Sequence, residues 1–386
     1  MIDEIRSVTV APRWILVRVR TSDGVTGWGE AIVPKRARAV CAAVAELDRV
    51  LHGADERRIE ELWHRARDGA FFRDGSVLAT AAAGVEHALW DIKARRLGVP
   101  VHDLLGGPVR DRVRVYAWIA GDRPGDVVDQ ARTRVGQGYG AVKMNATAEF
   151  DLLESPAAVD EVVARVGALR DEFGTELDIA LDFHGRVHRS MVAPLLRELE
   201  QFRLLWVEEP VAPGLDALLP DICRAKGATR IATGERCTTR RDFRELLTGG
   251  VVDVLQPDVS LTGLFELEKI CRMAEAFDVP VVPHCPNGPI SLAASLQVAA
   301  CCGNVPLLEQ SLGLHYNTGY AGLAAAEMHD YLVDPAPLSP SAGHLPVPAG
   351  SGLGVDLDPE AVARGESDWT LPDPDWRLPD GRLAEW

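Results

Sequence analysis

The chain has 386 residues, which is long for a single domain and suits two. Its composition, with 47% hydrophobic and 25% charged residues, is ordinary for a soluble globular protein, and no stretch reaches the roughly 18 apolar residues of a membrane span. The net charge of −16 argues against a nucleic-acid or anionic-membrane partner, and the charged opening stretch shows no signal-peptide pattern, so we expect a cytoplasmic protein.

The N-terminal region changes from a strand pattern to a helix pattern. Apolar and polar residues alternate in three short stretches, which we expect to be strands with a hairpin turn at Asp23-Gly24: residues 7–10, 14–21 and 24–30. Over residues 37–97 the apolar positions repeat with a helical period, which Gly98 and Pro100 end. The region predicts a small α+β domain over residues 1–110.

The rest of the chain alternates short apolar runs with helical stretches. Continuous apolar runs separated by helices indicate parallel strands that are covered on both faces. Eight runs fit a barrel better than an open sheet, and no dinucleotide-binding or phosphate-loop glycine motif is present. The runs cover residues 113–119, 141–145, 177–183, 204–209, 230–235, 251–258, 279–284 and 305–310.

Polar residues stand at the ends of six successive runs, about one strand-helix unit apart. In a parallel barrel the carboxyl ends of the strands meet on one face, where active sites lie. An acid at the end of one strand is often only a turn residue or a helix cap, but six in succession are poorly explained in that way. The sequence therefore predicts a ring made of Asp182, Glu208, Glu235, Asp258, His284 and Glu309.

Three of these acids form a predicted metal site. Asp182, Glu208 and Glu235 end consecutive strands, and carboxylates this close together need a counter-charge. Hard oxygen ligands suit Mg²⁺, which keeps coordination positions for water and substrate, whereas zinc would require more imidazole. The expected cofactor is Mg²⁺.

The motifs resemble those of the enolase superfamily, in its mandelate racemase subgroup, and most closely those of D-galactonate dehydratases. The resemblance extends over nearly the whole chain and includes ALWDIKARRLGVPVHDLLGGPVRD, DFHGRVH, EEPV, ATGER, LQPDVS and PHCPNGPISLAA. It implies an α/β fold, a modified (β/α)7β TIM barrel over residues 111–320. It also implies that residues 1–110 cap the open end of the barrel, with residues 321–386 packing back on this cap.

The resemblance also implies roles for the ring residues. Asp258 would orient His284, which would remove the C2 proton of a sugar acid whose carboxylate is bound to the metal. His184, two residues beyond Asp182, would face the same opening on a strand of period two and protonate the departing C3 hydroxyl. Glu309 would donate a hydrogen bond to the substrate carboxylate if it is protonated.

Other residues have weaker expected roles. Some relatives carry a second base where this chain has Asn145, so Lys143 is at best an electrostatic helper and a one-base reaction is favoured over racemisation. We keep both as substrate-binding candidates. His188, His315 and His87 are expected to be structural or loop residues.

The substrate is less constrained than the reaction. The chain departs from the dehydratase pattern at four positions near the expected sugar site: Lys35, Leu261, Thr262 and Asn287. The best candidate is dehydration of D-galactonate to a 2-keto-3-deoxy acid. A dehydratase of another aldonate or aldarate, an epimerase or racemase, and a non-catalytic member stay open. Relatives imply a symmetric homo-oligomer, often an octamer.

Overall fold

A computed structural model describes most of the chain. The described residues are 1–11, 13–69, 71–73, 75–119, 126–314, 328–367 and 376–385. His315, which was expected to be structural, lies outside them. Among the described helices, none is both long enough and apolar enough to cross a membrane.

The N-terminal part begins with an antiparallel sheet in the order β1-β2-β3, which confirms the three predicted strands. The first strand is longer than expected because Ile2 and Ile5 are buried as well. Gly24 takes a φ of 88° in the turn that joins the second and third strands. The bounds are β1 (Ile2–Val10), β2 (Trp14–Thr21) and β3 (Thr26–Ala31).

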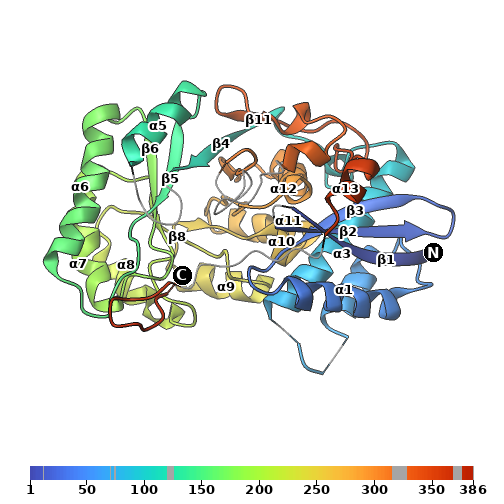
Figure 1. Cartoon of the computed structure of the whole chain (residues 1–386), viewed down its shortest axis with the longest axis horizontal. Helices are drawn as coiled ribbons and strands as arrows, with labels where there is room; N and C mark the ends of the chain where they lie inside the picture. The colour runs from blue at the N-terminus through green and yellow to red at the C-terminus, as the bar shows by residue number, and fades with distance from the viewer. Residues whose placement is uncertain are drawn as a thin grey trace.

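Helices then cover this sheet, and Figure 1 shows them beside the blue strands at one end of the molecule. Helix α3 packs so closely on β3 that a Cβ atom at Gly29 would lie 1.7 Å from the carbonyl oxygen of Gly84. The helix ends at Gly98 in a left-handed conformation with φ 69°, as its sequence predicted. The helices are α1 (Ala37–Leu51), α2 (Ile59–Arg67), α3 (Ser76–Leu97) and α4 (Val101–Leu104).

The second part is a ring of parallel strands, which confirms the predicted barrel. Its sheet has the order β10-β4-β5-β6-β7-β8-β9. The strands are β4 (Arg112–Trp118), β5 (Ala141–Asn145), β6 (Asp178–Asp182), β7 (Trp206–Glu208), β8 (Ile231–Thr233), β9 (Val254–Leu255) and β10 (Leu308–Glu309).

The seventh predicted strand, residues 279–284, is reduced to two isolated parallel bridges. These join Leu255 to Val281 and Asp258 to His284. Pro280 and Pro283 have no backbone N–H to donate, so a continuous ladder cannot form there. The ring is nevertheless closed by backbone hydrogen bonds from this segment to residues near β9 and β10.

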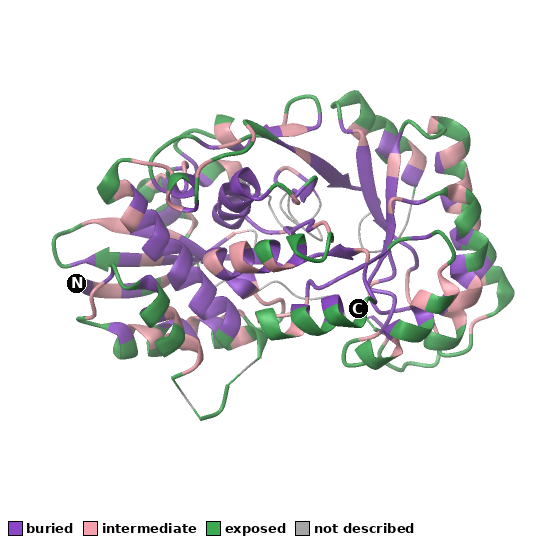
Figure 2. Ribbon diagram, turned by 180° about the vertical axis from the view of Figure 1, so that it is seen from behind, coloured by how far each residue is buried: buried purple, intermediate pink, exposed green. Residues whose placement is uncertain are grey.

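A helix follows each of the first seven barrel segments and lies outside the ring, as a (β/α)7β fold requires. Figure 2 shows the strands buried and exposed residues on the helices of the outer surface, whereas the last helix, residues 289–301, is buried along its whole length. The outer helices are α5 (Val127–Gly136), α6 (Pro156–Phe173), α7 (Arg189–Leu199), α8 (Leu219–Ala225), α9 (Arg240–Gly249), α11 (Leu264–Glu275) and α12 (Pro289–Cys301). A short helix α10 (Val259–Thr262) precedes α11.

The C-terminal residues contact both parts of the molecule. Strand β11 (His344–Pro346) pairs antiparallel with β4, and α13 (Pro359–Gly365) packs on β1. Farther along, Arg382 forms an ion pair of 3.0 Å with Asp151 of a barrel loop. Short 3-10 helices cover residues 200–202, 216–218, 328–331 and 336–338. The division at residues 110 and 320 stays a prediction.

Each of the eight barrel segments contributes one side chain to a buried cluster inside the ring. Tyr116 and Trp206 meet edge to face with their ring centroids 5.7 Å apart, and small side chains leave them room. The barrel is therefore a filled core and not a channel. The cluster consists of Tyr116, Ala141, Ala180, Trp206, Ala232, Val254, Val282 and Leu307.

Candidate active site

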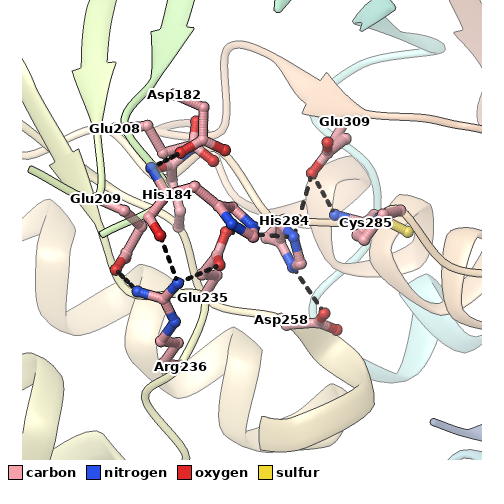
Figure 3. Close-up of polar contacts among 12 residues, drawn as sticks. Asp182, His184, Glu208, Glu209, Glu235, Arg236, Asp258, His284, Cys285 and Glu309 are labelled. Carbon is pink, nitrogen blue, oxygen red and sulfur yellow. Dashed lines mark hydrogen bonds and ion pairs between the residues drawn. The ribbon is translucent and has the colours of Figure 1, made fainter. Parts of the chain in front are cut away.

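A polar layer lies directly above this apolar cluster. Side chains two residues apart on a strand point to the same side, so the residue two positions after each cluster member also faces the barrel interior. This layer contains Trp118, Lys143, Asp182, Glu208, Gln256, His284 and Glu309. Glu235 and Asp258 join it from the loops just after β8 and β9 (Figure 3).

The three predicted metal ligands come together. Asp182, Glu208 and Glu235 each offer one carboxylate oxygen, and these atoms lie within 4.8 Å of one another. Oδ2 of Asp182 is buried and accepts no hydrogen bond. Burial, and then the charge of Glu208, raises the pKa of Asp182 well above its ordinary value. A hard cation with oxygen ligands fits this trio, because it would supply the missing positive charge.

Lys143 supplies one positive charge beneath the trio. Its Nζ lies 2.6 Å from Oε1 of Glu208 and 3.2 Å from Oε1 of Glu309. Burial alone would lower the pKa of Lys143, but Glu208 and Glu309 raise it well above its ordinary value. Lys143 and Asn145 are both buried, and neither is among the residues that line the cavity at the site. The geometry favours a counter-charge role for Lys143, and substrate contact by these two residues stays a prediction.

Asp258 and His284 form a dyad. Oδ2 of Asp258 lies 2.8 Å from Nδ1 of His284, and its Oδ1 accepts hydrogen bonds from the backbone of Ser260 and from Asn287. The imidazole therefore donates from Nδ1 to the carboxylate and presents Nε2 to the site.

Nε2 of His284 faces two further acids. It lies 3.4 Å from Glu235 Oε2 and 3.9 Å from Glu309 Oε2. Burial alone would lower the pKa of His284, but Glu235, Glu309 and Asp258 together raise it to about 10. Burial likewise opposes the charge on Glu235, yet His284 and Arg236 lower the pKa of that carboxyl to about 2.

Glu309 is surrounded by donors. Its Oε1 accepts a hydrogen bond of 2.5 Å from Trp118 Nε1, and its Oε2 accepts one of 2.9 Å from the backbone N–H of Cys285. Burial opposes its ionisation, but Lys143 and His284 lower its pKa. Donation of a hydrogen bond to a substrate carboxylate would require a protonated Glu309, which this shift disfavours, and that role stays a prediction. The lysine that contributes to the shift lies on a strand far away in the chain, so the sequence alone could not indicate it.

His184 reaches the site by a tight turn and not by strand alternation. Strand β6 ends at Asp182, and His184 takes a left-handed conformation with φ 53°. Its N–H donates to Asp182 Oδ1 at 2.7 Å, and its carbonyl accepts from Arg236 Nη2 at 3.3 Å. These contacts hold a backbone conformation that is uncommon for a non-glycine residue. His184 lines the cavity at the opening, as predicted, but the prediction that it continues the strand with period-two alternation is wrong.

A cavity of about 610 Å³ connects these groups with the cap. Asp182, His184, Glu235, Asp258 and His284 line it from the barrel, and Ile32, Val33 and Pro34 line it from the cap. Of the four positions at which the chain departs from the dehydratase pattern, Leu261 and Asn287 also line the cavity. Lys35 is exposed beside Pro34 and is not among the lining residues, and Thr262 instead donates to the backbone carbonyl of Asp258 at 2.9 Å.

Comparison with known proteins agrees with this geometry. Residues 5–106 match the N-terminal domain model of mandelate racemase and muconate lactonizing enzyme, and residues 126–361 match the enolase C-terminal domain-like model. The chain belongs to the enolase superfamily. Members of this superfamily bind a divalent metal ion, and the Asp182, Glu208 and Glu235 trio is a suitable ligand group.

Relatives cover the whole chain. A D-galactonate dehydratase of Variovorax paradoxus is 44% identical over 100% of both chains, and one of Xanthomonas euvesicatoria is 43% identical over 97% of both. Among solved structures, an enolase from Agrobacterium radiobacter with sodium and L-malate bound has a TM-score of 0.87 at 29% identity, covering 99% of both chains. A mandelate racemase/muconate lactonizing enzyme-like protein from Rubrobacter xylanophilus has a TM-score of 0.84 at 31% identity, covering 95% of this chain and 98% of its own.

Sequence reasoning missed an ion pair beside the predicted metal ligands. Arg236 lines the cavity, and its Nη1 lies 2.7 Å from Oε2 of Glu209 and its Nη2 3.8 Å from Glu235. Burial raises the pKa of Glu209 to about 7, although Arg236 opposes the shift. Both residues directly follow a predicted ligand in the sequence, so adjacency was the one signal available.

Glu30 was also missed, and it joins the cap to the barrel. This buried residue of β3 accepts hydrogen bonds from the backbone N–H groups of Gly288, Ile290 and Ser291, at 2.6, 3.1 and 3.1 Å. These N–H groups belong to the start of α12, in the segment that follows His284. Burial raises the pKa of Glu30 to about 7, against the lowering effect of the three N–H groups.

The shifted pKa of Glu30 predicts a pH-dependent stability. Its folded-state pKa of about 7 lies above the ordinary value of 4.5, so the folded state binds the proton more tightly than the unfolded chain. The contribution of this carboxyl to the free energy of unfolding should therefore fall as pH rises from 4.5 to 7, by up to about 3 kcal/mol. Denaturant unfolding of the wild type and of Glu30→Gln at pH 5, 6, 7 and 8 tests this, because the variant lacks the titration. Parallel pH curves for the two proteins would contradict the expectation.

Proposed function

We propose that this enzyme is a Mg²⁺-dependent acid-sugar dehydratase that acts on an aldonate, with D-galactonate as the first candidate. It would remove the C2 proton and the C3 hydroxyl and release a 2-keto-3-deoxy acid and water. The observation that carries the proposal is the meeting of His184 and His284 at one cavity, beside the carboxylate trio. The full-length similarity to D-galactonate dehydratases supports the same reaction.

Asp182, Glu208 and Glu235 would hold the cation. When bound, Mg²⁺ would fix the substrate carboxylate and stabilise the negative charge that develops when the C2 proton is removed. Nε2 of His284 would accept that proton, since Asp258 occupies Nδ1. His284 can do so only in its neutral form, and neutralisation of Glu235 by the bound cation would weaken the attraction that keeps its pKa at about 10.

His184 would complete the elimination. It lies at the same cavity and would give a proton to the C3 oxygen as the C3–O bond breaks. The resulting enol then becomes the 2-keto acid in water. An epimerase would need a second base, and Asn145 stands at the position where some relatives carry one, so a one-base elimination is favoured.

A panel of sugar acids tests the proposal. Aldonic and aldaric acids are incubated with the enzyme and Mg²⁺, and formation of 2-keto-3-deoxy acid is measured. We expect dehydration of at least one aldonate, with D-galactonate giving the highest kcat/KM. A His284→Asn protein purified in the same way excludes a contaminating dehydratase.

The choice of sugar depends on the cavity wall. Leu261 and Asn287 depart from the dehydratase pattern and line the cavity, and one lost hydrogen bond to a buried hydroxyl changes selectivity by roughly 5- to 150-fold. A kcat/KM for D-galactonate a hundredfold below that for another acid sugar would reject this substrate and keep the reaction. Failure of every acid sugar would reject the reaction itself. A cytoplasmic homo-oligomer, with an octamer as the expected assembly, stays a prediction, and light scattering can test the assembly.

A further inference from the structure

The buried side chain of Arg186 links His184 to two distant parts of the chain. Its Nη2 lies 3.4 Å from Nδ1 of His184, and its Nη1 donates to the carbonyl of Thr147 at 2.8 Å. Its guanidinium also stacks on the ring of Trp376, 4.4 Å from the centroid. Thr147 follows β5 and Trp376 belongs to the C-terminal segment, so the guanidinium is held by contacts that do not involve the histidine.

The chemistry of arginine fixes the state of the neighbouring ring. A guanidinium has only N–H donors and stays charged, so Nδ1 of His184 must act as the acceptor. The single proton of the neutral imidazole is then on Nε2.

The other histidine of the site has the opposite arrangement. Nδ1 of His284 faces the acceptor-only carboxylate of Asp258, so in the neutral ring that the proposed reaction requires the proton is on Nδ1 and Nε2 carries the lone pair. A basic and an acidic partner thus give the two rings opposite tautomers. His184 can donate a proton to the cavity, and His284 can accept one.

We infer that Arg186 is a positioning residue that sets His184 as the proton donor, and that Trp376 holds Arg186 in place. The inference rests on the proposed dehydration. As the C3–O bond breaks, the oxygen takes the Nε2 proton of His184 and leaves as water, while the C2–H electron pair forms the double bond. The guanidinium beside Nδ1 stabilises the ring that has lost its proton, and water reprotonates the ring before the next turnover.

The first test is Arg186→Met, which keeps a long side chain and removes every N–H donor of the guanidinium. We expect the dehydration rate to fall roughly 10- to 100-fold, as for other groups that orient a catalytic ring. Exchange of the C2 proton with solvent deuterium should stay within about twofold of the wild-type rate. A 3-deoxy-3-fluoro aldonate should also lose fluoride at a near-normal rate, because fluoride leaves without a proton from His184.

Arg165→Met is the matched control. Arg165 Nη2 donates to the carbonyl of Ala146 at 2.6 Å, one residue before the carbonyl that Arg186 contacts, and its Nη1 lies 3.8 Å from Glu161 on the same helix. This variant should keep all three activities. Arg186→Lys should recover part of the lost dehydration. Trp376→Leu should slow dehydration by a smaller factor than Arg186→Met and should leave C2 exchange and fluoride release near normal.

Equal loss of dehydration, C2 exchange and fluoride release in Arg186→Met would overturn the inference, because it would indicate a general structural role. Unchanged dehydration would overturn it as well.

The tautomer itself is tested without any substrate. NMR of ¹⁵N-histidine protein, with the His184 signals identified by their loss in His184→Asn, should show the Nε2–H tautomer in the wild type and a mixture in Arg186→Met. A wild-type Nδ1–H tautomer refutes the inference even if dehydration is found. Absence of dehydration in the wild type with the expected tautomer refutes the proposed function and leaves the positioning of His184 intact.

Discussion

His284→Asn should lose both dehydration and exchange of the C2 proton, whereas His184→Asn should lose dehydration alone. A general acid or base contributes roughly 100- to 10,000-fold to a rate, so each loss should be large. The two histidines line the same cavity, and the proposal gives them different roles. The qualitative difference between the variants is therefore more informative than either rate.

The expected difference follows from the partners of each ring. Asp258 directs the Nε2 lone pair of His284 toward the site, so removal of this ring leaves no base at that position. His184 is held by Asp182 and Arg236 through its backbone, and the asparagine variant can keep both backbone contacts. Proton removal at C2 should then continue while the C3 hydroxyl stays in place.

Exchange is followed by NMR of the sugar acid in deuterium oxide, and dehydration by formation of the 2-keto acid. His188→Asn is the control, because His188 lies four residues farther along and contacts Ser190 at 3.0 Å outside the dyad. It should keep both activities. Equal loss of exchange in His184→Asn and His284→Asn would contradict the division of roles.

The barrel was predictable because its signal is repeated. Eight apolar runs at regular spacing give the strand order, and side-chain alternation gives the layer that faces inward. The run 279–284 was misjudged as a strand because its apolar residues hide the effect of Pro280 and Pro283, which leaves two bridges. The N-terminal strand was judged too short because the buried Ile2 and Ile5 are interrupted by charged residues.

The ring of polar residues was predictable for the same reason. Each residue ends a run, and parallel strands bring their ends together even when about 25 residues separate them in the sequence. The lowered pKa of Glu309 was not predictable, because it depends on Lys143, which is 166 positions away in the chain and yet lies 3.2 Å from the carboxylate. The tight turn at His184 depends in the same way on Arg236, through a single hydrogen bond.

Contacts between the cap, the barrel and the C-terminal segment were the least predictable. Glu30 lies 258 residues from Gly288, and Trp376 lies 190 from Arg186. No local pattern marks such pairs, since a buried glutamate in a strand or a tryptophan near a chain end has many structural explanations. They become visible only when the fold brings the partners together, and they are the contacts that position the loops around the site.

Removal of the metal should abolish turnover and leave the fold intact. The barrel ring is closed by backbone hydrogen bonds, and Lys143 already balances part of the negative charge of the trio. Mg²⁺ at a hundred times its Kd should raise the free energy of unfolding by about 2.7 kcal/mol, because it binds the folded state. Thermal unfolding with and without chelator measures this, and activity that persists in excess chelator would exclude the metal-dependent mechanism.

Two variants of the trio should lose the response to Mg²⁺ alike but should differ in their free energy of unfolding without the metal. Asp182→Asn and Glu208→Gln should both lose activity and the Mg²⁺-dependent rise in stability, since each removes a ligand charge. In chelator, however, Asp182→Asn should be more stable than the wild type by about 0.5–2 kcal/mol. Oδ2 of Asp182 accepts no hydrogen bond, and the raised pKa shows that its charge is unfavourable there, so a neutral amide relieves the repulsion.

Glu208→Gln should behave in the opposite way because both oxygens of its carboxylate accept hydrogen bonds. It accepts from Lys143 at 2.6 Å, from Trp206 Nε1 at 2.9 Å and from Gln256 Nε2 at 2.7 Å. The amide of glutamine would turn an N–H₂ group toward at least one of these donors, which should lower the free energy of unfolding in chelator by about 1–3 kcal/mol. Glu172→Gln on the outer helix α6, which removes an exposed ion pair with Arg132, should change neither metal response nor activity. If Asp182→Asn is instead less stable than the wild type in chelator, the charge of Asp182 is not unfavourable in the metal-free site, and a cation is not needed there to balance it.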